Sequence, residues 1–286
     1  MARSVYRSVV AAAAVLVVAG CGSHRSAHSH PVRPPAGRRT ARRSAAALPT
    51  LAAQSAALRR LARLGLPVYC GGRRGHLVAL TFDDGPGPYT GLALRELRRA
   101  HARATFFLVG RSIARFPAWP RRERALAAIG DHTVTHPLLP ALPLAGAIAE
   151  IAGGRAAAER AAGPSVDLFR PPYGAHTRAI DAEVRREGMV EILWDVDSED
   201  SLVSPPQDFH AISANIRRSI RPGSIVLMHE NRGQTERALR AILPALRRRR
   251  LQAVTLPELL AADPPTSGTL RAGARGCGVV RAGGGG

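Results

Sequence analysis

The stretch that decides the fold is Leu77-Val78-Ala79-Leu80-Thr81-Phe82-Asp83-Asp84-Gly85-Pro86. A short apolar run that ends at Gly and Pro is typical of a buried strand followed by a turn. Two adjacent carboxylates at the end of such a strand are costly to bury unless a cation or a hydrogen-bond network holds them. One carboxylate can then bind a metal ion while its neighbour remains free as a general base. Because Asp-Asp-Gly-Pro is also a common turn sequence, the rest of the chain must decide between these interpretations.

The composition allows one α/β domain of barrel size with tails, since the chain has 286 residues and 45% of them are hydrophobic. Aromatic residues make up only 4%, so the core must consist mainly of Ala, Leu, Val and Ile. The formal net charge is +20, but 13 Arg and no acidic residue precede Asp83, whereas 28 Arg and 21 acidic residues lie from that position onward. The later part is therefore only mildly basic, which argues against a nucleic-acid partner. The basic N-terminal third favours anionic surfaces such as lipid or wall polymer.

The N-terminus has the pattern of a secretory signal peptide, predicted over residues 1–20. Arg3 and Arg7 precede an apolar run at residues 9–18, which is shorter than the roughly 20 residues that a membrane span requires. The Val-Ala-Gly-Cys sequence that ends at Cys21 resembles the bacterial lipobox. This resemblance implies cleavage before Cys21 and a diacylglyceryl anchor on its sulfur, and the alternative is an ordinary signal peptide with an incidental cysteine. We therefore expect a secreted, extracytoplasmic lipoprotein anchored to the cell membrane.

Beyond the signal peptide, composition divides the chain into three parts. Residues 21–65 are predicted to be a lipid-anchored stalk with a short helix at 51–64. That helix carries leucines separated by arginines, so it either lies on a membrane surface or packs against the domain. Residues 66–262 form the predicted folded domain, and the Gly-rich residues 263–286 form a predicted loose tail apart from its cysteine.

The domain shows alternating strand and helix patterns. Strands are predicted at residues 77–82, 105–109, 166–169, 190–194, 224–228 and 251–254, with Val134 in a short extended piece; helices are predicted at 90–100, 121–129, 143–161, 176–187, 207–220 and 234–248. Alternation at this spacing predicts an α/β fold with a mostly parallel sheet and helices outside it. Parallel barrels place their chemistry at the carboxyl ends of the strands, although the pattern does not reveal whether the barrel closes.

Two motifs in predicted loops carry groups suited to chemistry. His132 and His136 are four residues apart, which on a helical turn puts both imidazoles on one face and suits a metal ion. A chance pair is an equally simple interpretation in a chain with ten histidines. The sequence Arg170-Pro171-Pro172-Tyr173-Gly174 follows a predicted strand, and its prolines fix an extended backbone. This loop either aims the Arg170 guanidinium and the Tyr173 amide inward or is a rigid surface loop.

Two further strand ends carry titratable groups. Residues 194–200 contain four acidic residues after a tryptophan, and this stretch is either a solvated loop or part of a site. His229 follows the apolar run 225–228. A lone histidine at such a place is commonly a core residue whose ring nitrogens are hydrogen-bonded.

In this order, TFDDGP, HTVTH, RPPYG, DSED and IVLMH resemble the five motifs of the NodB-type polysaccharide deacetylases, carbohydrate esterase family four. The resemblance covers roughly residues 77–260. It implies a distorted (β/α) barrel of the NodB-homology type in the domain 66–262. It also implies metal-dependent hydrolytic N-deacetylation of an N-acetylglucosamine-type polysaccharide, peptidoglycan or chitin-like, with release of acetate.

The resemblance assigns a role to each matching residue. Asp84, His132 and His136 match the ligands of a divalent metal, usually Zn²⁺, although such a set also accepts Co²⁺ or Mn²⁺. Asp83 matches the catalytic base and His229 the catalytic acid. The supporting positions are Arg170, which orients the base; Asp200, which tunes the acid; Leu227, a wall of the acetyl-methyl pocket; and Tyr173, whose N–H helps to hold the oxyanion.

Two positions depart from the family pattern: Ser201 stands where the fourth motif usually ends in Trp, and Glu230 where Asp often follows the histidine. The missing Trp puts sugar recognition in doubt, because sugar faces stack on such aromatics. The alternative function is a non-catalytic cell-wall glycan-binding surface protein that retains the metal site. The intact base and acid argue against it, since a binding protein needs neither. The expected partners are an acetylated glycan and the membrane through the lipid anchor, with no nucleic acid and a monomeric chain.

The three cysteines allow one disulfide if Cys21 carries lipid. Cys70 precedes the first predicted strand and Cys277 follows the last helix. In a closed barrel these two chain ends come near each other, and an oxidising compartment favours their pairing. The alternative is two unpaired thiols.

Overall fold

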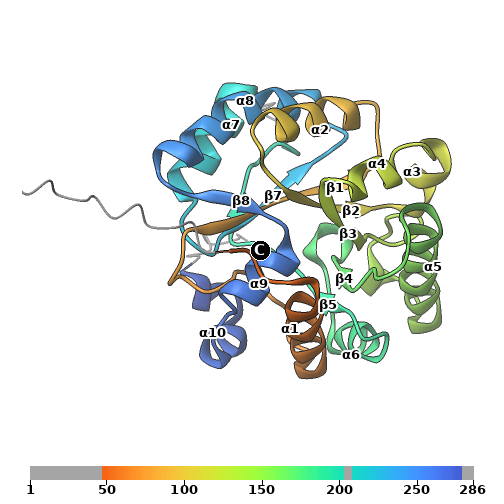
Figure 1. Cartoon of the computed structure of the whole chain (residues 1–286). Coiled ribbons are helices and arrows are strands. Elements are labelled where there is room, and N and C mark those ends of the chain that lie inside the picture. The colour runs from red at the N-terminus through yellow and green to blue at the C-terminus, as the bar shows by residue number, and fades with distance from the viewer. Residues whose placement is uncertain (1–46, 203–207, 279–286) are drawn as a thin grey trace, which may run out of the picture. The chain divides into compact units, whose positions relative to one another are not determined.

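The computed structural model describes residues 47–202 and 208–278. In this part, parallel strands form one curled sheet (Figure 1): β1 (Leu77–Gly85), β2 (Ala104–Leu108), β3 (Ala127–Asp131), β4 (Leu168–Phe169), β5 (Val190–Glu191), β6 (Val196–Asp197), β7 (Ile225–His229) and β8 (Gln252–Val254). Neighbouring strands follow the order β5-β4-β3-β2-β1-β7-β6, and β8 pairs with β1. Within the described residues no ladder joins β5 to β6, so the barrel is open at that edge. The predicted α/β class and distorted (β/α) barrel are confirmed.

The chain before β1 lies against this open edge. Val68 bridges to Ile192 in parallel orientation, and Cys70 bridges to Ser224 in antiparallel orientation. The Leu193 amide also donates to the Val68 carbonyl at 2.8 Å. The residues just before β1 therefore contact both sides of the opening.

Helices surround the sheet (Figure 1): α1 (Leu51–Leu64), α2 (Thr90–Arg99), α3 (Gly110–Arg115), α4 (Pro120–Arg124), α5 (Leu144–Ala162), α6 (Arg178–Arg186), α7 (Phe209–Ser219), α8 (Gly233–Arg248), α9 (Leu256–Ala262) and α10 (Ser267–Ala272), with 3₁₀ turns at Leu139–Ala141, Pro172–Gly174 and Gly273–Cys277. None of the helices in the described residues is long and apolar enough to cross a membrane.

Alternate residues of β1 serve two separate hydrophobic clusters. Val78, Leu80 and Phe82 pack in the cluster that includes residues of α2, α7 and α8. Leu77 and Ala79 belong to the cluster on the opposite face, which includes residues of α1 and α9. Because side chains alternate along a strand, Asp83 continues the series of Leu77 and Ala79 and reaches the carboxyl edge on the inner face.

Helix α1 packs against the barrel, which settles the two interpretations of residues 51–64. Leu58, Leu61 and Ala62 are buried in the cluster that contains Leu256 and Leu259. The helix thus packs against the domain, which is one of the two arrangements that the sequence left open. The predicted signal peptide, Cys21 and most of the stalk lie outside the described residues.

Three sequence-based expectations are wrong. The predicted helix at 121–129 is the short helix α4 followed by strand β3, because the apolar run around Ile129 pairs with β2 instead of continuing the helix. Val134 lies in a bend rather than an extended piece. The first part of the predicted loose tail forms α10 and a 3₁₀ turn, which the Cys277 disulfide joins to the chain before β1.

Candidate active site

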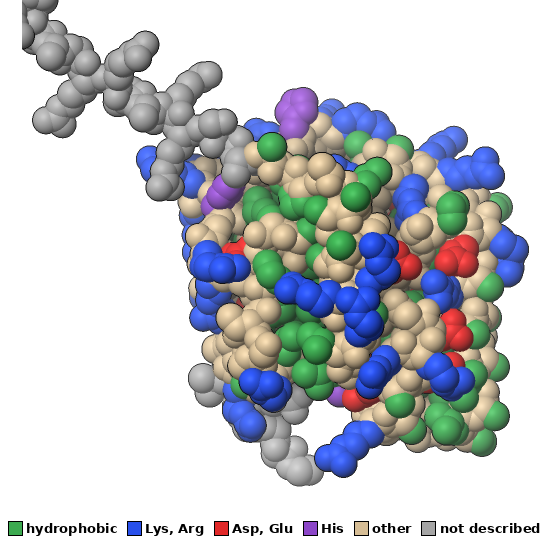
Figure 2. Space-filling view, turned by 60° about the horizontal axis from the view of Figure 1, so that its bottom comes forward, with side chains coloured by type: hydrophobic (Ala, Val, Ile, Leu, Met, Phe, Trp, Pro, Cys, Tyr) green, Lys and Arg blue, Asp and Glu red, His purple; other side chains and the backbone are tan. Residues whose placement is uncertain are grey.

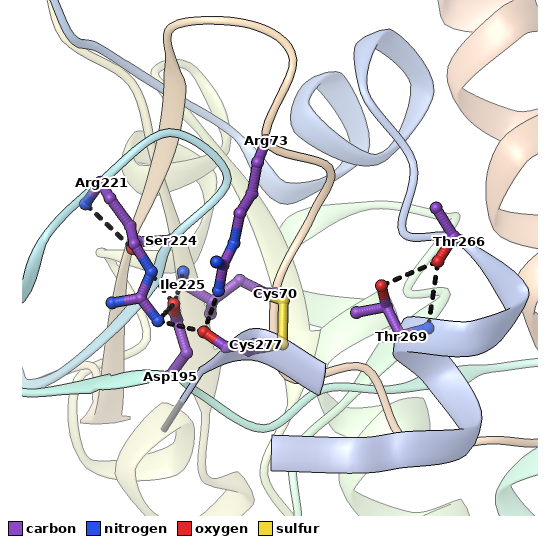
Figure 3. The surroundings of a disulfide bond; sticks show 9 residues. All are labelled: Cys70, Arg73, Asp195, Arg221, Ser224, Ile225, Thr266, Thr269 and Cys277. Carbon is purple, nitrogen blue, oxygen red and sulfur yellow. Dashed lines mark hydrogen bonds and ion pairs between the residues drawn. A yellow bond between two sulfur atoms is a disulfide. The ribbon is translucent and has the colours of Figure 1, made fainter. Parts of the chain in front are cut away.

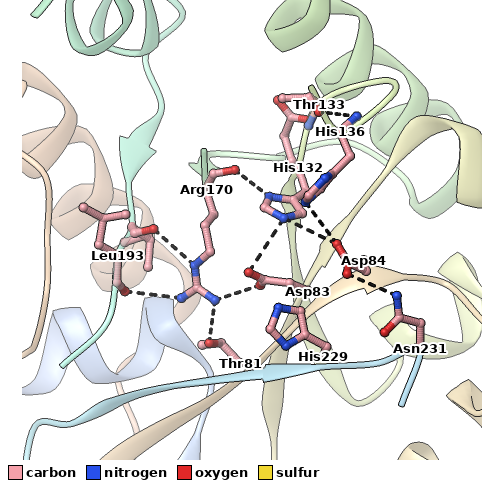
Figure 4. A network of polar contacts seen from close by, with 12 residues as sticks. Thr81, Asp83, Asp84, His132, Thr133, His136, Arg170, Leu193, His229 and Asn231 are labelled. Carbon is pink, nitrogen blue, oxygen red and sulfur yellow. Dashed lines mark hydrogen bonds and ion pairs between the residues drawn. The ribbon is translucent and has the colours of Figure 1, made fainter. Parts of the chain in front are cut away.

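The carboxyl ends of four strands bring the candidate residues together (Figure 4). Asp83 and Asp84 end β1, His132 follows β3, Arg170 follows β4, and His229 ends β7. Strands β1 and β7 are in register such that Asp83 lies beside His229. The parallel sheet therefore places all of these groups at one edge, as the sequence predicts.

Asp84, His132 and His136 form a group that fits a divalent metal. The Nε2 atoms of His136 and His132 lie 3.2 and 3.8 Å from Asp84 Oδ1, and the potential ligand atoms all lie within 4.8 Å of one another. His132 Nδ1 contacts the Arg170 carbonyl at 2.6 Å, so Nδ1 carries the proton and the Nε2 lone pair faces the aspartates. Burial is the largest cause that lowers the pKa of His136, which favours the neutral, ligating ring.

The two histidines reach this arrangement without a helix. Their segment follows β3 as an irregular loop in which Thr133 and His136 have φ values of 69° and 64°. Asp131 Oδ1 accepts a hydrogen bond from the Thr133 amide, and Glu150 of α5 accepts from the next two amides. Side-chain acceptors, rather than helical periodicity, therefore hold the loop that carries both imidazoles.

Asp83 is held by a buried arginine. Arg170 Nη1 donates to Asp83 Oδ1 and to Thr81 Oγ1, each at 2.8 Å. The Arg170 side chain is fully buried, and its Nε and Nη2 atoms donate to the carbonyls of Ile192 and Leu193. Burial lowers the pKa of Arg170, and the adjacent Asp83 carboxylate opposes that shift. The ion pair fixes one oxygen of Asp83, while Oδ2 faces the metal group, 3.7 Å from His132 Nε2.

His229 and Asp200 form a second ion pair. Their Nδ1 and Oδ1 atoms are 2.6 Å apart, and Asp200 Oδ2 accepts from the His229 amide and the Thr235 hydroxyl. Burial acts to lower the pKa of His229, but the hydrogen bond and charge of Asp200, followed by the charges of Asp83 and Asp84, raise it to about 9. Burial likewise opposes the charged form of Asp200, yet contacts with His229 and Thr235 lower its pKa overall. The pair is therefore an imidazolium next to a carboxylate at neutral pH.

The remaining predicted residues line the same edge. Leu227 lies two residues before His229 on the same face of β7, beside Thr81. Tyr173 is 67% exposed, has a φ of 62°, and packs its ring edge-on against His136 with centroids 4.8 Å apart. Of the acidic loop, Asp200 alone is hydrogen-bonded to His229, whereas Asp195 accepts from the Ile225 amide and pairs with Arg221.

A pocket of about 290 Å³ adjoins Tyr173 and supplies aromatic surface that the sequence did not reveal. Tyr69 and Trp194 line it together with Ala274 of the C-terminal 3₁₀ turn. The Cys70–Cys277 disulfide anchors that turn, and the side chains of Arg73 and Arg221 bond to the Cys277 carbonyl (Figure 3). Ser201 is not among the lining residues of this pocket.

Three supporting residues were also missed. The Thr81 hydroxyl accepts a hydrogen bond from Arg170, and the Thr235 hydroxyl donates one to Asp200. The side-chain amide of Asn231 donates to Asp84 Oδ2 at 3.1 Å. Thr81 could have been found, because it lies two residues before Asp83 and so shares its face of the strand. Thr235 and Asn231 carry no comparable signal in the sequence.

Comparison with known proteins identifies the family. The family model described as polysaccharide deacetylase matches residues 71–192. The chain is 34% identical over 199 residues to a chitooligosaccharide deacetylase of Bradyrhizobium sp. (strain ANU 289), covering 64% of this chain and 90% of that protein. It is 32% identical over 186 residues to a peptidoglycan-N-acetylglucosamine deacetylase of Bacillus cereus, covering 62% of this chain and 67% of that one.

Solved structures agree with this assignment. A crystal structure of a peptidoglycan N-acetylglucosamine deacetylase superposes with a TM-score of 0.64 and 30% identity, covering 68% of this chain and 92% of the other. A family-four pseudoenzyme from Bacillus anthracis gives a TM-score of 0.63 and 28% identity, covering 68% of each chain. Sequence and structure together show that the chain belongs to the polysaccharide deacetylase family of hydrolases, with the NodB-type fold.

Proposed function

We propose that this protein is a metal-dependent hydrolase that removes acetyl groups from an N-acetylglucosamine-type polysaccharide, releasing acetate and a free amine. The observation that carries the proposal is the placement of Asp83 and His229 side by side on adjacent strands, each paired with its own buried partner. A base and an acid fixed next to a three-ligand group are what amide hydrolysis requires.

The first proton transfer is assigned to Asp83. A divalent cation held by Asp84, His132 and His136, with Zn²⁺ favoured by this mixed set, would polarise the acetamide carbonyl and acidify a water. Arg170 fixes Asp83 Oδ1 at 2.8 Å, so the other oxygen is the one available to take the proton of the attacking water. Asp84 is instead turned toward the two imidazoles, which separates the roles of the adjacent carboxylates.

The second proton transfer is assigned to His229. Its Nδ1 is occupied by Asp200, so Nε2–H is the atom that can protonate the leaving amine. A pKa of about 9 keeps the ring charged at neutral pH and ready to donate. The Tyr173 amide is the proposed donor to the oxyanion, a contribution of about 3–4 kcal/mol for one well-placed donor. Leu227 is the proposed wall against the acetyl methyl group.

The aromatic pocket next to Tyr173 is the proposed contact for a neighbouring sugar. Tyr69 and Trp194 line this pocket, and we assign to them the sugar contact for which the family usually has Trp at the position of Ser201. Arginine side chains outnumber acidic ones on the face drawn in Figure 2, in keeping with the net charge of +20. An anionic wall polymer such as peptidoglycan is the first proposed substrate class. Chitin-like oligomers are the second substrate class, because a relative is named as a chitooligosaccharide deacetylase.

The proposed location is the outer surface of the cell membrane, with the chain monomeric and anchored through Cys21. The signal-like N-terminus and the relatives named for peptidoglycan support a place outside the cytoplasm. The disulfide between Cys70 and Cys277 is consistent with an oxidising compartment.

Acetate release tests the function against the non-catalytic alternative. The full-length protein is incubated with chitooligosaccharides and with peptidoglycan fragments, with chelator, without it, and after Zn²⁺ is restored. We expect acetate that is lost with chelator and recovered with metal, and none from the Asp83→Asn variant. The non-catalytic alternative would be favoured if the protein binds glycans but, on every substrate and with metal present, releases no more acetate than the Asp83→Asn variant does.

A further inference from the structure

A second group of metal-type ligands lies behind the loop that carries Tyr173. His176 follows that loop, Asp181 is in the first turn of α6, and Glu191 belongs to β5. His176 Nδ1 lies 2.8 Å from Asp181 Oδ1 and 3.5 Å from Glu191 Oε1. The three potential ligand atoms lie within 4.8 Å of one another, the same limit that holds for the group around Asp84.

These distances are those of ligands around one small cation. Two ligand atoms that are each about 2.0–2.1 Å from a tetrahedral metal lie about 3.4 Å apart. The spacings of 2.8 and 3.5 Å bracket that value, as the spacings of 3.2 and 3.8 Å do in the group of Asp84, His132 and His136. The second group is thus as compact as the group of Asp84, His132 and His136.

Glu191 provides an independent sign of a missing partner. Its side chain is only 3% exposed, and neither carboxylate oxygen has a hydrogen-bond partner among the described residues. The His176 Nδ1 atom carries at most one hydrogen, and Asp181 is the nearer acceptor. The neighbouring Asp181 disfavours an ionised Glu191 through its charge, and the charge of His176 opposes this effect. A buried carboxylate without a hydrogen-bond partner is costly.

A divalent cation would satisfy the three side chains together. Two carboxylates and a neutral imidazole neutralise a charge of +2, and a mixed nitrogen and oxygen set suits Zn²⁺. His176 is three residues beyond Tyr173, so a cation bound here would tie the loop of Tyr173 to α6 and β5. Its effect would be structural, since none of the three residues belongs to the proposed catalytic set.

We propose that His176, Asp181 and Glu191 form a second divalent-cation site, of zinc type, that fastens the Tyr173 loop to the barrel. The site is distinct from the group of Asp84, His132 and His136, and its existence does not depend on the proposed deacetylase function.

Zinc stoichiometry of the full-length protein tests this site with Zn²⁺ alone as the probe. The parent variant carries His24→Ala, His28→Ala and His30→Ala, which removes the three imidazoles near the N-terminus as competing ligands. After chelator treatment, Zn²⁺ bound per chain is measured by mass spectrometry and calorimetry. We expect two equivalents in the parent, one after adding Asp84→Asn with His132→Ala, and none after further adding Glu191→Gln.

Two controls keep the result unambiguous. Glu187→Gln is the matched control, because Glu187 directly follows α6, pairs with Arg155, and lies outside the cluster. It should leave the second equivalent in place. His176→Ala repeats the test at a side chain that is 26% exposed and so less able to disturb folding, which circular dichroism checks.

Spectroscopy gives a second, separate measurement. X-ray absorption at the zinc edge, in the variant that lacks Asp84 and His132, should show one imidazole among oxygen ligands. Zn²⁺ should also raise the melting temperature of that variant but not that of its Glu191→Gln derivative. No zinc bound after loss of Asp84 and His132, undiminished zinc in Glu191→Gln, or a shell with two imidazoles would each overturn the site.

Discussion

Replacing Asp200 by Asn tests the assignment of His229 as the acid. The substitution removes the negative charge next to Nδ1 but keeps an oxygen able to accept from the His229 amide and the Thr235 hydroxyl. Raising the pKa of His229 from 6.5 to about 9 corresponds to about 3 kcal/mol in favour of the protonated ring, at 1.36 kcal/mol for each pH unit. Without the Asp200 charge, burial continues to favour the neutral ring, so the pKa should fall by about 2.5 pH units, back to its ordinary value of 6.5.

The consequence is measurable in the pH dependence of kcat/KM for acetate release. A group that must be protonated gives the alkaline limb of the profile. At pH 7.5, a pKa of about 9 leaves about 97% of the rings protonated, whereas a pKa of 6.5 leaves about 9%. Asp200→Asn should therefore lose about tenfold at pH 7.5 from protonation alone, and much less at pH 6.

The control is Glu199→Gln, in the same loop. Glu199 accepts from Asn215 and does not contact His229, so its loss should leave the limb in place. Metal content is measured in both variants to exclude an effect through the metal group. An alkaline limb that stays unmoved in Asp200→Asn, with normal metal content, would refute the pairing of these residues in the acid step.

Three further predictions concern the base, the disulfide and the anchor. Asp83→Asn should abolish acetate release with little change in bound metal, whereas Asp84→Asn should lose both; equal metal loss in the two variants would mean that the roles are reversed. Replacing Cys70 and Cys277 together by Ser should lower the free energy of unfolding by about 2–5 kcal/mol in urea denaturation, because the bridge spans a sequence separation of 207 residues, and unchanged stability would contradict this. Cys21→Ala should move the protein from the membrane fraction into the soluble fraction, and a wild-type chain found only in the medium would reject the lipid anchor.

The sequence predicted the site as far as strand ends determine it. An apolar run that stops at a chemical group, as before Asp83 and His229, marks the carboxyl end of a parallel strand, and these ends meet at one edge of the sheet. Neighbouring strands therefore bring together residues that are far apart in the chain. This argument requires only that neighbouring strands run parallel, which the alternation of strands and helices predicts.

The parts that failed depend on contacts between distant segments. The Ala-rich residues before Asp131 have helical composition, yet pairing with β2 makes them a strand. Residues 267–277 form a helix and a 3₁₀ turn next to a disulfide and to the arginines that donate to the Cys277 carbonyl. Tyr69 reaches the pocket because the chain before β1 fills the open edge of the barrel. Local propensity carries no information on any of these contacts.

Arg170 combines a position that the sequence predicted with contacts that it did not predict. Its position after a strand was predictable, but its four hydrogen-bond acceptors come from β1 and from the residues after β5. The carbonyls of Ile192 and Leu193 belong to the open edge, where the chain pairs with Val68 instead of with a neighbouring strand. The same guanidinium holds the Asp83 carboxylate, so the orientation of the base depends on how that edge is closed. The segment before β1 thus contacts the same edge whose carbonyls hold Arg170, and through Arg170 that edge supports the position of the base.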